Sequence, residues 1–303
     1  PDLILLDVLM PEMDGFATCQ LLKADATLRE VPVIFLTGNS DRESVVRGFT
    51  VGAVDFIAKP FHAEELLARV RTHLELRFAR SRLLDLADKL GRYLSPQVYA
   101  SIFSGERDVR IESYRRDLTV FFSDIADFTR TAERMSEGEL TRWLNGYLDE
   151  MARIALQHGG TLDKFIGDCI MAFWGAPIAD ARHAQRAVAC AMEMQRTLAA
   201  FKAEYATELG ELADGFDIGI GIHSGPAVVG FIGAEQKLEY TAIGDTVNLA
   251  SRIEGMTKGL GRILVSADTV AGCANGARFR SRGSYTVKGR QQAVELFEPE
   301  QDA

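Results

Sequence analysis

Apolar runs alternate with stretches of helical character in the first 77 residues. Three short apolar runs, each of a length that suits a strand buried on both faces of a parallel sheet, occupy residues 2–7, 31–37 and 55–58. Helix-length stretches separate or follow them at 15–28, 41–50 and 63–77. This alternation of strand and helix predicts an α/β doubly wound sheet.

A seven-residue repeat of apolar side chains follows. Its first row is Leu76, Leu83 and Leu90, and its second row, three residues later in each heptad, is Ala79, Leu86 and Tyr93. The pattern predicts a parallel coiled-coil dimer. The alternative is a single amphipathic helix that lies on a neighbouring domain, and three heptads leave both open. Ser95-Pro96 is expected to end this helix and to start another.

From about residue 116 the pattern becomes α+β. Strands are expected at 118–122, 162–166, 170–174, 216–223 and 228–232, and helices at 140–154, 181–207 and 246–255. Gly167-Asp168 lies between two of these strands and predicts a hairpin turn. The order of elements predicts a ferredoxin-like β-α-β-β-α-β core with additions.

Composition narrows the class of protein. A chain of 303 residues suits about two domains, and 47% hydrophobic with 25% charged residues is typical of globular proteins. The net charge of −9 argues against a nucleic-acid partner or an anionic membrane surface. No apolar run reaches about 18 residues, so we expect no membrane insertion. Four scattered cysteines indicate reduced thiols and a cytoplasmic location. The chain starts at Pro1 without a signal peptide, and we interpret it as a fragment.

Three polar residues follow the three apolar runs of the first region. Asp7 ends the first run, Thr37 ends the second and Lys59 follows the third. Sites in open α/β sheets lie outside the carboxyl ends of the strands, so these side chains should converge. A carboxylate that accepts a phosphoryl group needs a cation and a donor for the new oxygens.

The motifs LLDVLMPEMDG and KPF, together with Thr37, resemble the receiver domain of response regulators over residues 1–77. The resemblance implies a flavodoxin-like fold in which a histidine kinase phosphorylates Asp7, Thr37 and Lys59 contact the phosphoryl oxygens, and Phe56 occupies the switch aromatic position. The family has two earlier strands and an acidic pair that binds Mg²⁺, and this sequence lacks both. We therefore expect a partial receiver that is not phosphorylated at Asp7 in this chain.

Two aspartates stand out in the second region. Asp124 lies within FSDIADFT at the end of a strand, and Asp168 lies at the hairpin turn of KFIGDCIMAFWG. Neighbouring strands would place the two carboxylates side by side, and two like charges held close need a cation between them. Oxygen ligands of this kind suit Mg²⁺, which keeps substrate phosphates as further ligands.

The motif YTAIGDTVNLASRIE places Asn248 and Arg252 on one face of a helix. An asparagine can orient an oxygen, and an arginine supplies a forked cation for charge that develops on a phosphoryl group. Lys288, near the end of the chain, is a candidate phosphate-binding residue.

These motifs resemble the catalytic domain of class III adenylate/guanylate cyclases over residues 116–298. The resemblance implies that ATP is converted to 3′,5′-cyclic AMP and pyrophosphate by attack of the ribose 3′-hydroxyl on the α-phosphate. It also implies two Mg²⁺ or Mn²⁺ ions per active site. The implied roles are metal binding for Asp124, Asp168 and the Ile125 carbonyl, ribose positioning for Asn248, transition-state stabilisation for Arg252 and binding of the terminal phosphates for Lys288.

By the same resemblance, Lys164 and Thr241 select the base. The family's adenine-selective members carry lysine at the first position, where it donates to adenine N1, whereas a guanine-selective site would usually carry a glutamate. A Lys/Thr pair is similar to the subgroup that bicarbonate can stimulate. The alternative for Lys164 is a solvated hairpin charge. His223 is expected to be structural, and Pro226 stands where some members have an arginine.

In the family the catalytic set divides across a dimer, with metal ligands from one subunit and the residues Lys164, Thr241, Asn248 and Arg252 from the other. This chain contains both halves, so a symmetric homodimer would form two equal sites. We expect a receiver at 1–77, a helical dimerisation linker at 78–113 and a cyclase domain at 114–300, regulated through two-component signalling. Guanylate cyclase and a non-catalytic nucleotide-binding module are the alternatives. The acidic charge disfavours a DNA-binding regulator, and Gly159-Gly160 is not followed by the diguanylate cyclase signature.

Overall fold

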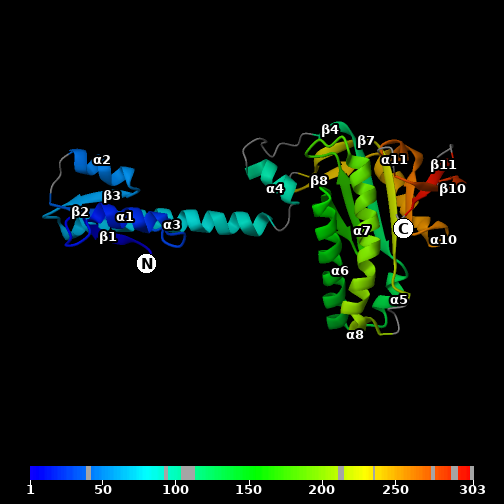
Figure 1. The fold of residues 1–303 in the computed structure, drawn as a ribbon, viewed down its shortest axis with the longest axis horizontal. Coiled ribbons are helices and arrows are strands. Elements are labelled where there is room, and N and C mark those ends of the chain that lie inside the picture. Colours follow the sequence, from blue (N-terminus) through cyan, green and yellow to red (C-terminus); the bar gives the residue numbers. More distant parts are fainter. Residues whose placement is uncertain are drawn as a thin grey trace. The chain divides into compact units, whose positions relative to one another are not determined.

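A computed structural model of the chain describes residues 1–38, 42–91, 95–103, 113–210, 215–234, 236–273, 277–287 and 293–300. The chain divides into two compact units, Pro1–Tyr93 and Leu94–Ala303, which are described in turn (Figure 1).

The first unit contains a parallel sheet of order β1-β2-β3 with three helices. The strands are β1 (Ile4–Asp7), β2 (Val33–Thr37) and β3 (Asp55–Ala58), and the helices are α1 (Gly15–Ala24), α2 (Arg42–Thr50) and α3 (Ala63–Gly91). Leu6, Phe16, Cys19 and Phe35 belong to the core between sheet and helices. The predicted alternation of strand and helix is confirmed.

A close approach explains the glycine that begins α1. The side chain of Asp14 caps the helix by accepting a hydrogen bond of 2.7 Å from the amide of Ala17. The amide of Gly15 donates to the carbonyl of Val8, and a Cβ on Gly15 would collide with the carbonyl oxygen of Asp7. Glycine therefore allows the helix to start directly beside the end of β1.

Helix α3 continues without a break past residue 77, where the sequence analysis placed the end of the receiver. The carboxylate of Asp55 anchors it to β3, through Arg69 Nη1 at 3.0 Å and His73 Nε2 at 3.1 Å. In this chain Leu76 and Leu83 are exposed, as the coiled-coil hypothesis requires. Tyr93 and the side chain of Leu90 lie outside the described residues, and the coiled coil stays a prediction.

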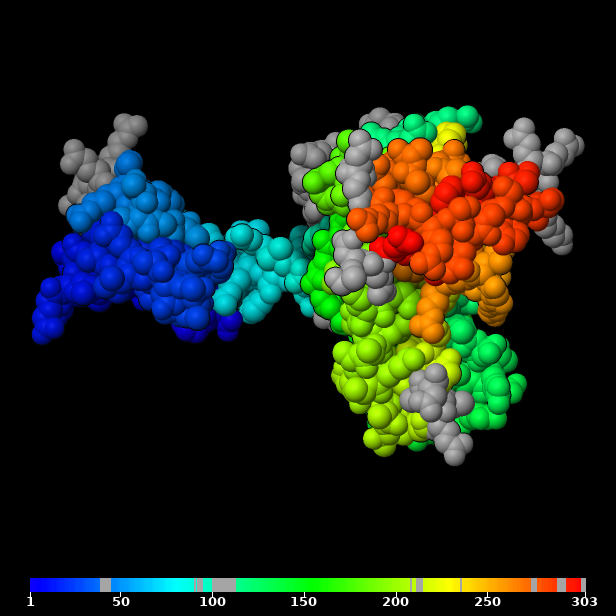
Figure 2. Space-filling view, turned by 45° about the vertical axis from the view of Figure 1, so that its right-hand side comes forward, coloured from blue at the N-terminus to red at the C-terminus, as the bar shows by residue number. Residues whose placement is uncertain are grey.

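The second unit is built on one mixed sheet of order β10-β11-β9-β7-β4-β6-β5, with β8 paired to β7. Its strands are β4 (Ser113–Ile125), β5 (Thr161–Ile166), β6 (Cys169–Trp174), β7 (Ile218–Ala234), β8 (Lys237–Ile243), β9 (Ile263–Ser266), β10 (Phe279–Tyr285) and β11 (Val294–Pro299). The central order β7-β4-β6-β5 is that of a ferredoxin-like core, as predicted. Figure 2 shows β10 and β11, in orange and red, at the surface of this unit.

The helices of the second unit cover both faces of this sheet. They are α4 (Pro96–Phe103), α5 (Phe128–Ala132), α6 (Glu137–Gln157), α7 (His183–Glu204), α8 (Ala206–Leu209), α9 (Asp245–Gly255), α10 (Thr257–Leu260) and α11 (Ala267–Ala271). Helices α6 and α7 run side by side across one face (Figure 1). The core beneath them contains the fully buried side chains of Phe121, Trp143, Tyr147 and Trp174.

Glycines in β7 let α9 pack closely on the other face. A Cβ on Gly221 would collide with the backbone of Glu254, and a Cβ on Gly225 would stand 3.1 Å from Thr246 Oγ1. The helix backbone can therefore rest directly on the strand. Because Gly219 pairs with Asp124 on β4, the end of α9 lies beside the end of β4.

Two expectations about the strands were wrong or incomplete. The sequence predicted separate strands at 216–223 and 228–232, whereas β7 is continuous from Ile218 to Ala234. Ser224-Gly225-Pro226 lies between the two expected strands, but β4 pairs with β7 throughout this stretch. On the other edge of β7, β9 pairs with residues 220–222 and β8 with residues 228–234. Pro226 falls between these two partners, where a proline interrupts no ladder on that edge. Strands β8 to β11 were not assigned from sequence.

Candidate active site

Asp124 and Asp168 come together at the end of two neighbouring strands. Asp124 precedes the last residue of β4, and Asp168 lies in the turn that joins β5 to β6. Because β6 pairs antiparallel with β4, this turn reaches the end of β4. The Oδ2 atom of Asp168 accepts a hydrogen bond of 3.1 Å from the amide of Ile125. The predicted juxtaposition of the two aspartates is therefore confirmed.

The two carboxylates repel each other in a partly buried place. Burial and the adjacent Asp168 raise the pKa of Asp124 to about 6. Burial, together with the charges of Asp124 and Asp168, raises the pKa of Glu254 to about 7. Lys258 is the cation that opposes both shifts. The site therefore concentrates negative charge that a bound cation would neutralise.

The donor set fits a hard divalent cation such as Mg²⁺ or Mn²⁺. Asp124 and Asp168 supply carboxylate oxygens, and Ile125 adds a backbone carbonyl at the same strand end. Among the described residues no group of three or more His, Cys, Asp or Glu side chains is placed to hold a metal ion. The remaining ligands would come from water and substrate, which is usual for Mg²⁺ at phosphate-binding sites.

Lys164 and Thr241 lie on different strands and meet at Asp163. The hydroxyl of Thr241 donates to Asp163 Oδ2 at 2.5 Å, and Lys164 Nζ lies 3.5 Å from Asp163 Oδ1. Lys164 also forms an ion pair with Glu239 of β8. The structure thus brings together the two residues that the sequence analysis assigned to base selection, and Lys164 is not a freely solvated charge.

Asp163 and Glu239 are two functional candidates that the sequence analysis missed. The side chain of Asp163 is fully buried, and burial raises its pKa. The β5–β6 register slips between Leu162 and Lys164, so Asp163 is the extra residue of a bulge that redirects its side chain. A bulge has no simple sequence signature. Glu239 could have been found from its position two residues before Thr241, on the same face of one strand.

Asn248 and Arg252 lie one turn apart on α9. Asn248 is exposed and Arg252 is half-buried. Among the contacts of the described residues, none joins either side chain to Asp124 or Asp168, and Arg252 has no ion-pair partner there. The structure of one chain therefore does not unite them with the carboxylate pair. Lys288 lies outside the described residues. His223 is buried and its Nδ1 lies 2.7 Å from Ser266 Oγ, which fits the expected structural role.

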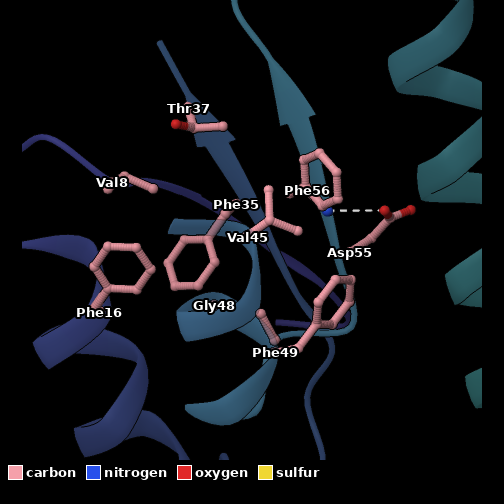
Figure 3. Close-up of a pocket in the computed structure, with 10 residues that line it drawn as sticks. Val8, Phe16, Phe35, Thr37, Val45, Gly48, Phe49, Asp55 and Phe56 are labelled. Atoms are coloured by element: carbon pink, nitrogen blue, oxygen red, sulfur yellow. Dashed lines mark hydrogen bonds between the residues drawn. The ribbon is translucent and has the colours of Figure 1, made fainter. Parts of the chain in front are cut away.

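Two of the three receiver residues, Asp7 and Lys59, come together as expected. Lys59 forms an ion pair with Asp7, and this ammonium group lowers the pKa of the Asp7 carboxyl. Thr37 ends the strand between them, and its carbonyl accepts from the amide of Lys59 at 2.7 Å. Figure 3 shows Thr37 and Phe56 on neighbouring strands at the rim of a small cavity of about 10 Å³. Phe16 and Phe35 also line this cavity.

Residues 110–297 match the family model of the adenylate and guanylate cyclase catalytic domain, which is more than half of the chain. The chain belongs to this cyclase family. Residues 1–71 match the family model of the response regulator receiver domain. Both family assignments made from the sequence motifs, receiver and cyclase, are confirmed.

Relatives and solved structures agree with the cyclase family. Adenylate cyclase 1 of Rhizobium meliloti (strain 1021) is 39% identical over 248 residues, covering 81% of this chain and 36% of that protein. The crystal structure of the adenylyl cyclase CyaB from P. aeruginosa is similar with a TM-score of 0.58 and 36% identity, covering 64% of this chain and 98% of that one. The guanylyl cyclase Cya2 gives a TM-score of 0.58 and 35% identity, covering 62% and 94%.

This cyclase chain spans about a third of the length of the Rhizobium relative. The chain is similar to both an adenylyl and a guanylyl cyclase, so family membership does not decide whether the substrate carries adenine or guanine. Among the described helices none has the length and apolar character needed to cross a membrane.

Proposed function

We propose that this chain is an adenylate cyclase, which converts ATP to 3′,5′-cyclic AMP and pyrophosphate. The observation that carries the proposal is the convergence of Asp124 and Asp168 at one strand end, with Lys164 and Thr241 gathered around Asp163 on the same sheet. The first group suits a metal-assisted phosphoryl reaction and the second suits a purine base.

The hydrogen-bond direction at Thr241 supports adenine. Its hydroxyl donates to Asp163, so the oxygen lone pairs remain available as acceptors. Adenine presents a 6-amino donor, whereas guanine presents an oxygen acceptor at the same place. The ammonium of Lys164 has three donors, so it can keep Glu239 and still donate to adenine N1. A buried site with these directions would reject guanine by leaving polar atoms unpaired.

The chain's own residues account for the remaining steps. Asp124, Asp168 and the Ile125 carbonyl would hold two divalent cations, which would supply a lowered pKa for the ribose 3′-hydroxyl and neutralisation of the triphosphate. Asn248 orients the ribose so that the 3′-oxygen faces the α-phosphate in line with the leaving pyrophosphate. Arg252 donates to the oxygens that gain charge in the transition state. Lys288 holds the terminal phosphates.

A homodimer would complete each site. Asn248 and Arg252 of one subunit would face the carboxylate pair of the other, the division that the family resemblance implies, since no contact among the described residues joins them to that pair in their own chain. Exposed apolar side chains support such an interface: Phe165 is 44% exposed and Ile166 55% exposed on the strand that leads to Asp168. Two copies related by a twofold axis would form two equal sites.

Measuring cyclic nucleotide production tests the proposal. The purified chain would be assayed with Mn²⁺ and either ATP or GTP, beside Asp168→Ala. Cyclic AMP from ATP that disappears in the variant supports the proposal. Production of cyclic GMP from GTP would agree with the mechanism but contradict the proposed preference for adenine. The likeness to the guanylyl cyclase Cya2 favours this alternative. A dimer that makes neither product would indicate a nucleotide-binding module without turnover.

The receiver points to control by a histidine kinase in two-component signalling. Lys59 pairs with Asp7 at the edge of the sheet where Thr37 ends β2, so these residues would hold a phosphoryl group in a receiver that also carries the acidic pair, and α3 leads directly out of this domain. A change at Asp7 would then alter the position of α3 and so the closure of the cyclase dimer. Removing residues 1–92 tests this coupling, and unchanged activity and regulation would contradict it.

A further inference from the structure

Glu254 brings a third carboxylate to the metal site from a different element. It is the penultimate residue of α9, on the side of the helix that faces the sheet. Its Oε1 atom lies 3.3 Å from the point where a Cβ of residue 219 would stand. Gly219 is paired directly with Asp124 across the β4–β7 ladder. The side chain of Thr257 fills the space that the missing side chain of Gly219 leaves free, and the Glu254 carboxylate lies next to it, on the side of the ladder where Asp124 stands.

The surroundings of Glu254 do not explain a purely structural role. No hydrogen bond or ion pair is formed by its carboxylate among the described residues, although the side chain is partly buried. The charged groups that act on it are Asp124, Asp168 and Lys258. Two of these three are like charges, which raise its pKa as burial does. Held there without a partner, the carboxylate costs folding free energy.

We propose that Glu254 is a positioning residue of the metal site, whose carboxylate accepts hydrogen bonds from water molecules bound to the cation. The inference rests on the metal site of the proposed function. An outer position is indicated because the three carboxylates do not form a group placed to hold one ion directly. Carboxylates that bind the water ligands of a metal ion orient those ligands and strengthen metal binding. The positive charge of Lys258, beside the same cluster, disfavours binding of the cation.

Helix α9 would then serve two active sites of one dimer. Its exposed face presents Asn248 and Arg252 to the partner's carboxylate pair, and its last turn presents Glu254 to the pair of its own chain. Cation binding at one site would thus fix the helix that carries the transition-state residues of the other.

Mn²⁺ binding to the metal-free protein tests the role of Glu254 without turnover. Free Mn²⁺ would be followed by electron paramagnetic resonance during titration of the full chain, with no nucleotide present. Glu254→Gln keeps the shape and removes the charge, and we expect about tenfold weaker binding. Lys258→Met should bind about two- to fivefold more tightly, because a positive charge near the cation is removed. Glu295→Gln, an exposed change on β11, should bind as the wild type does.

Thermal unfolding without metal provides the second measurement. Relief of the repulsion should leave the melting temperature of Glu254→Gln equal to that of the wild type or higher. Unchanged Mn²⁺ affinity in Glu254→Gln would overturn the inference. If the melting temperature of that variant were also lowered, the role of Glu254 would be structural. If Glu254→Gln does not fold, unchanged affinity in Lys258→Met overturns it. Wild type that binds no Mn²⁺ overturns it too, whereas loss of cyclic AMP production alone contradicts only the proposed function.

Discussion

The two units each place an aspartate at the end of a buried strand, but the two carboxylates have opposite surroundings. Asp7 faces the ammonium group of Lys59, which lowers its pKa. Asp124 faces Asp168 in a partly buried site, which raises its pKa to about 6. The strand end alone therefore does not decide what an aspartate does. Its role depends on which residue another part of the sheet places beside it.

The difference has a chemical consequence for each site. Around Asp7 the chain itself supplies the opposite charge through Lys59, which holds the carboxylate as an anion. Around Asp124 the chain supplies more negative charge, which the proposed divalent cation would neutralise.

Removal of one carboxylate from the pair should have the largest effect. Asp124→Asn leaves the fold intact but removes a metal ligand, so cyclic AMP production with Mn²⁺ should fall by at least about 10³-fold. The control is Asp149→Asn, an exposed change on α6, which should retain full activity. Activity of Asp124→Asn within about tenfold of wild type would contradict a metal role for this residue.

Arg252→Ala should lower kcat by about 10²- to 10³-fold, because a donor to the transition state is lost. The shared site makes a sharper prediction. When Arg252→Ala and Asp168→Ala chains are mixed in equal amounts, half of the dimers are hybrids and each hybrid has one intact site. Activity should therefore recover to about a quarter of the wild-type value. A mixture no more active than its components would place the whole site within one chain.

Glu239→Gln tests the support of Lys164 at the base. The variant loses the ion pair that fixes the lysine, so KM for ATP should rise about three- to tenfold while kcat changes little. The preference for ATP over GTP should also weaken. Glu137→Gln, an exposed change at the start of α6, serves as the control. A fall in kcat at constant KM would mean that Glu239 acts on the chemical step.

Much of this arrangement could be predicted from sequence, and the reason is local. The strands of the receiver are continuous apolar runs, and Asp7 and Asp124 each stand where such a run ends. Asp168 is marked by its hairpin turn, and Asn248 and Arg252 by helical spacing. These features depend on residues within one element, so their pattern is visible without the fold.

The missed features depend on contacts between elements. The bulge at Asp163 exists only relative to β6, and Glu239 matters only because β8 passes beside β5. Glu254 reaches the metal site only because Gly219 lets α9 approach the strand. For the same reason β7 was divided into two strands: its turn-like residues are held extended by pairing with β4.

The stability of the metal-free protein should depend on pH in the direction set by the raised pKa values. A carboxyl whose pKa is higher in the folded state stabilises the fold below its unfolded pKa, near 3.8 for Asp124, and loses that contribution as pH rises through about 6. The raised pKa of Glu254 extends the pH range over which stability is lost to about 7. With chelator present, the melting temperature should therefore be a few degrees higher at pH 5 than at pH 7.5.

Other groups titrate over the same range, so the comparison is made against Asp124→Asn. We expect the variant to lose part of the pH dependence, on the order of 1 kcal/mol because the carboxyl is partly solvated. Mn²⁺ at pH 7.5 should stabilise the wild type and not the variant. Identical pH profiles for the two proteins would show that the carboxylates do not repel each other.

The smallest effect is expected on the other side of the comparison, at Lys59. In Lys59→Met the ammonium group is lost, so the pKa of Asp7 should rise toward its usual range, as a ¹³C titration of the Asp7 carboxyl in the full chain would show. Because the folded pKa of Asp7 is depressed, its contribution to stability is present above the unfolded pKa and is lost as pH falls through the folded one. The pair is exposed, so that contribution is at most about 1 kcal/mol. Lys89→Met, which breaks an exposed pair with Asp85 on α3, should leave the Asp7 titration unchanged. If Lys59→Met also leaves the Asp7 titration unchanged, the lysine does not neutralise Asp7. The difference between the two aspartates would then come only from the raised pKa of Asp124 in the cyclase domain.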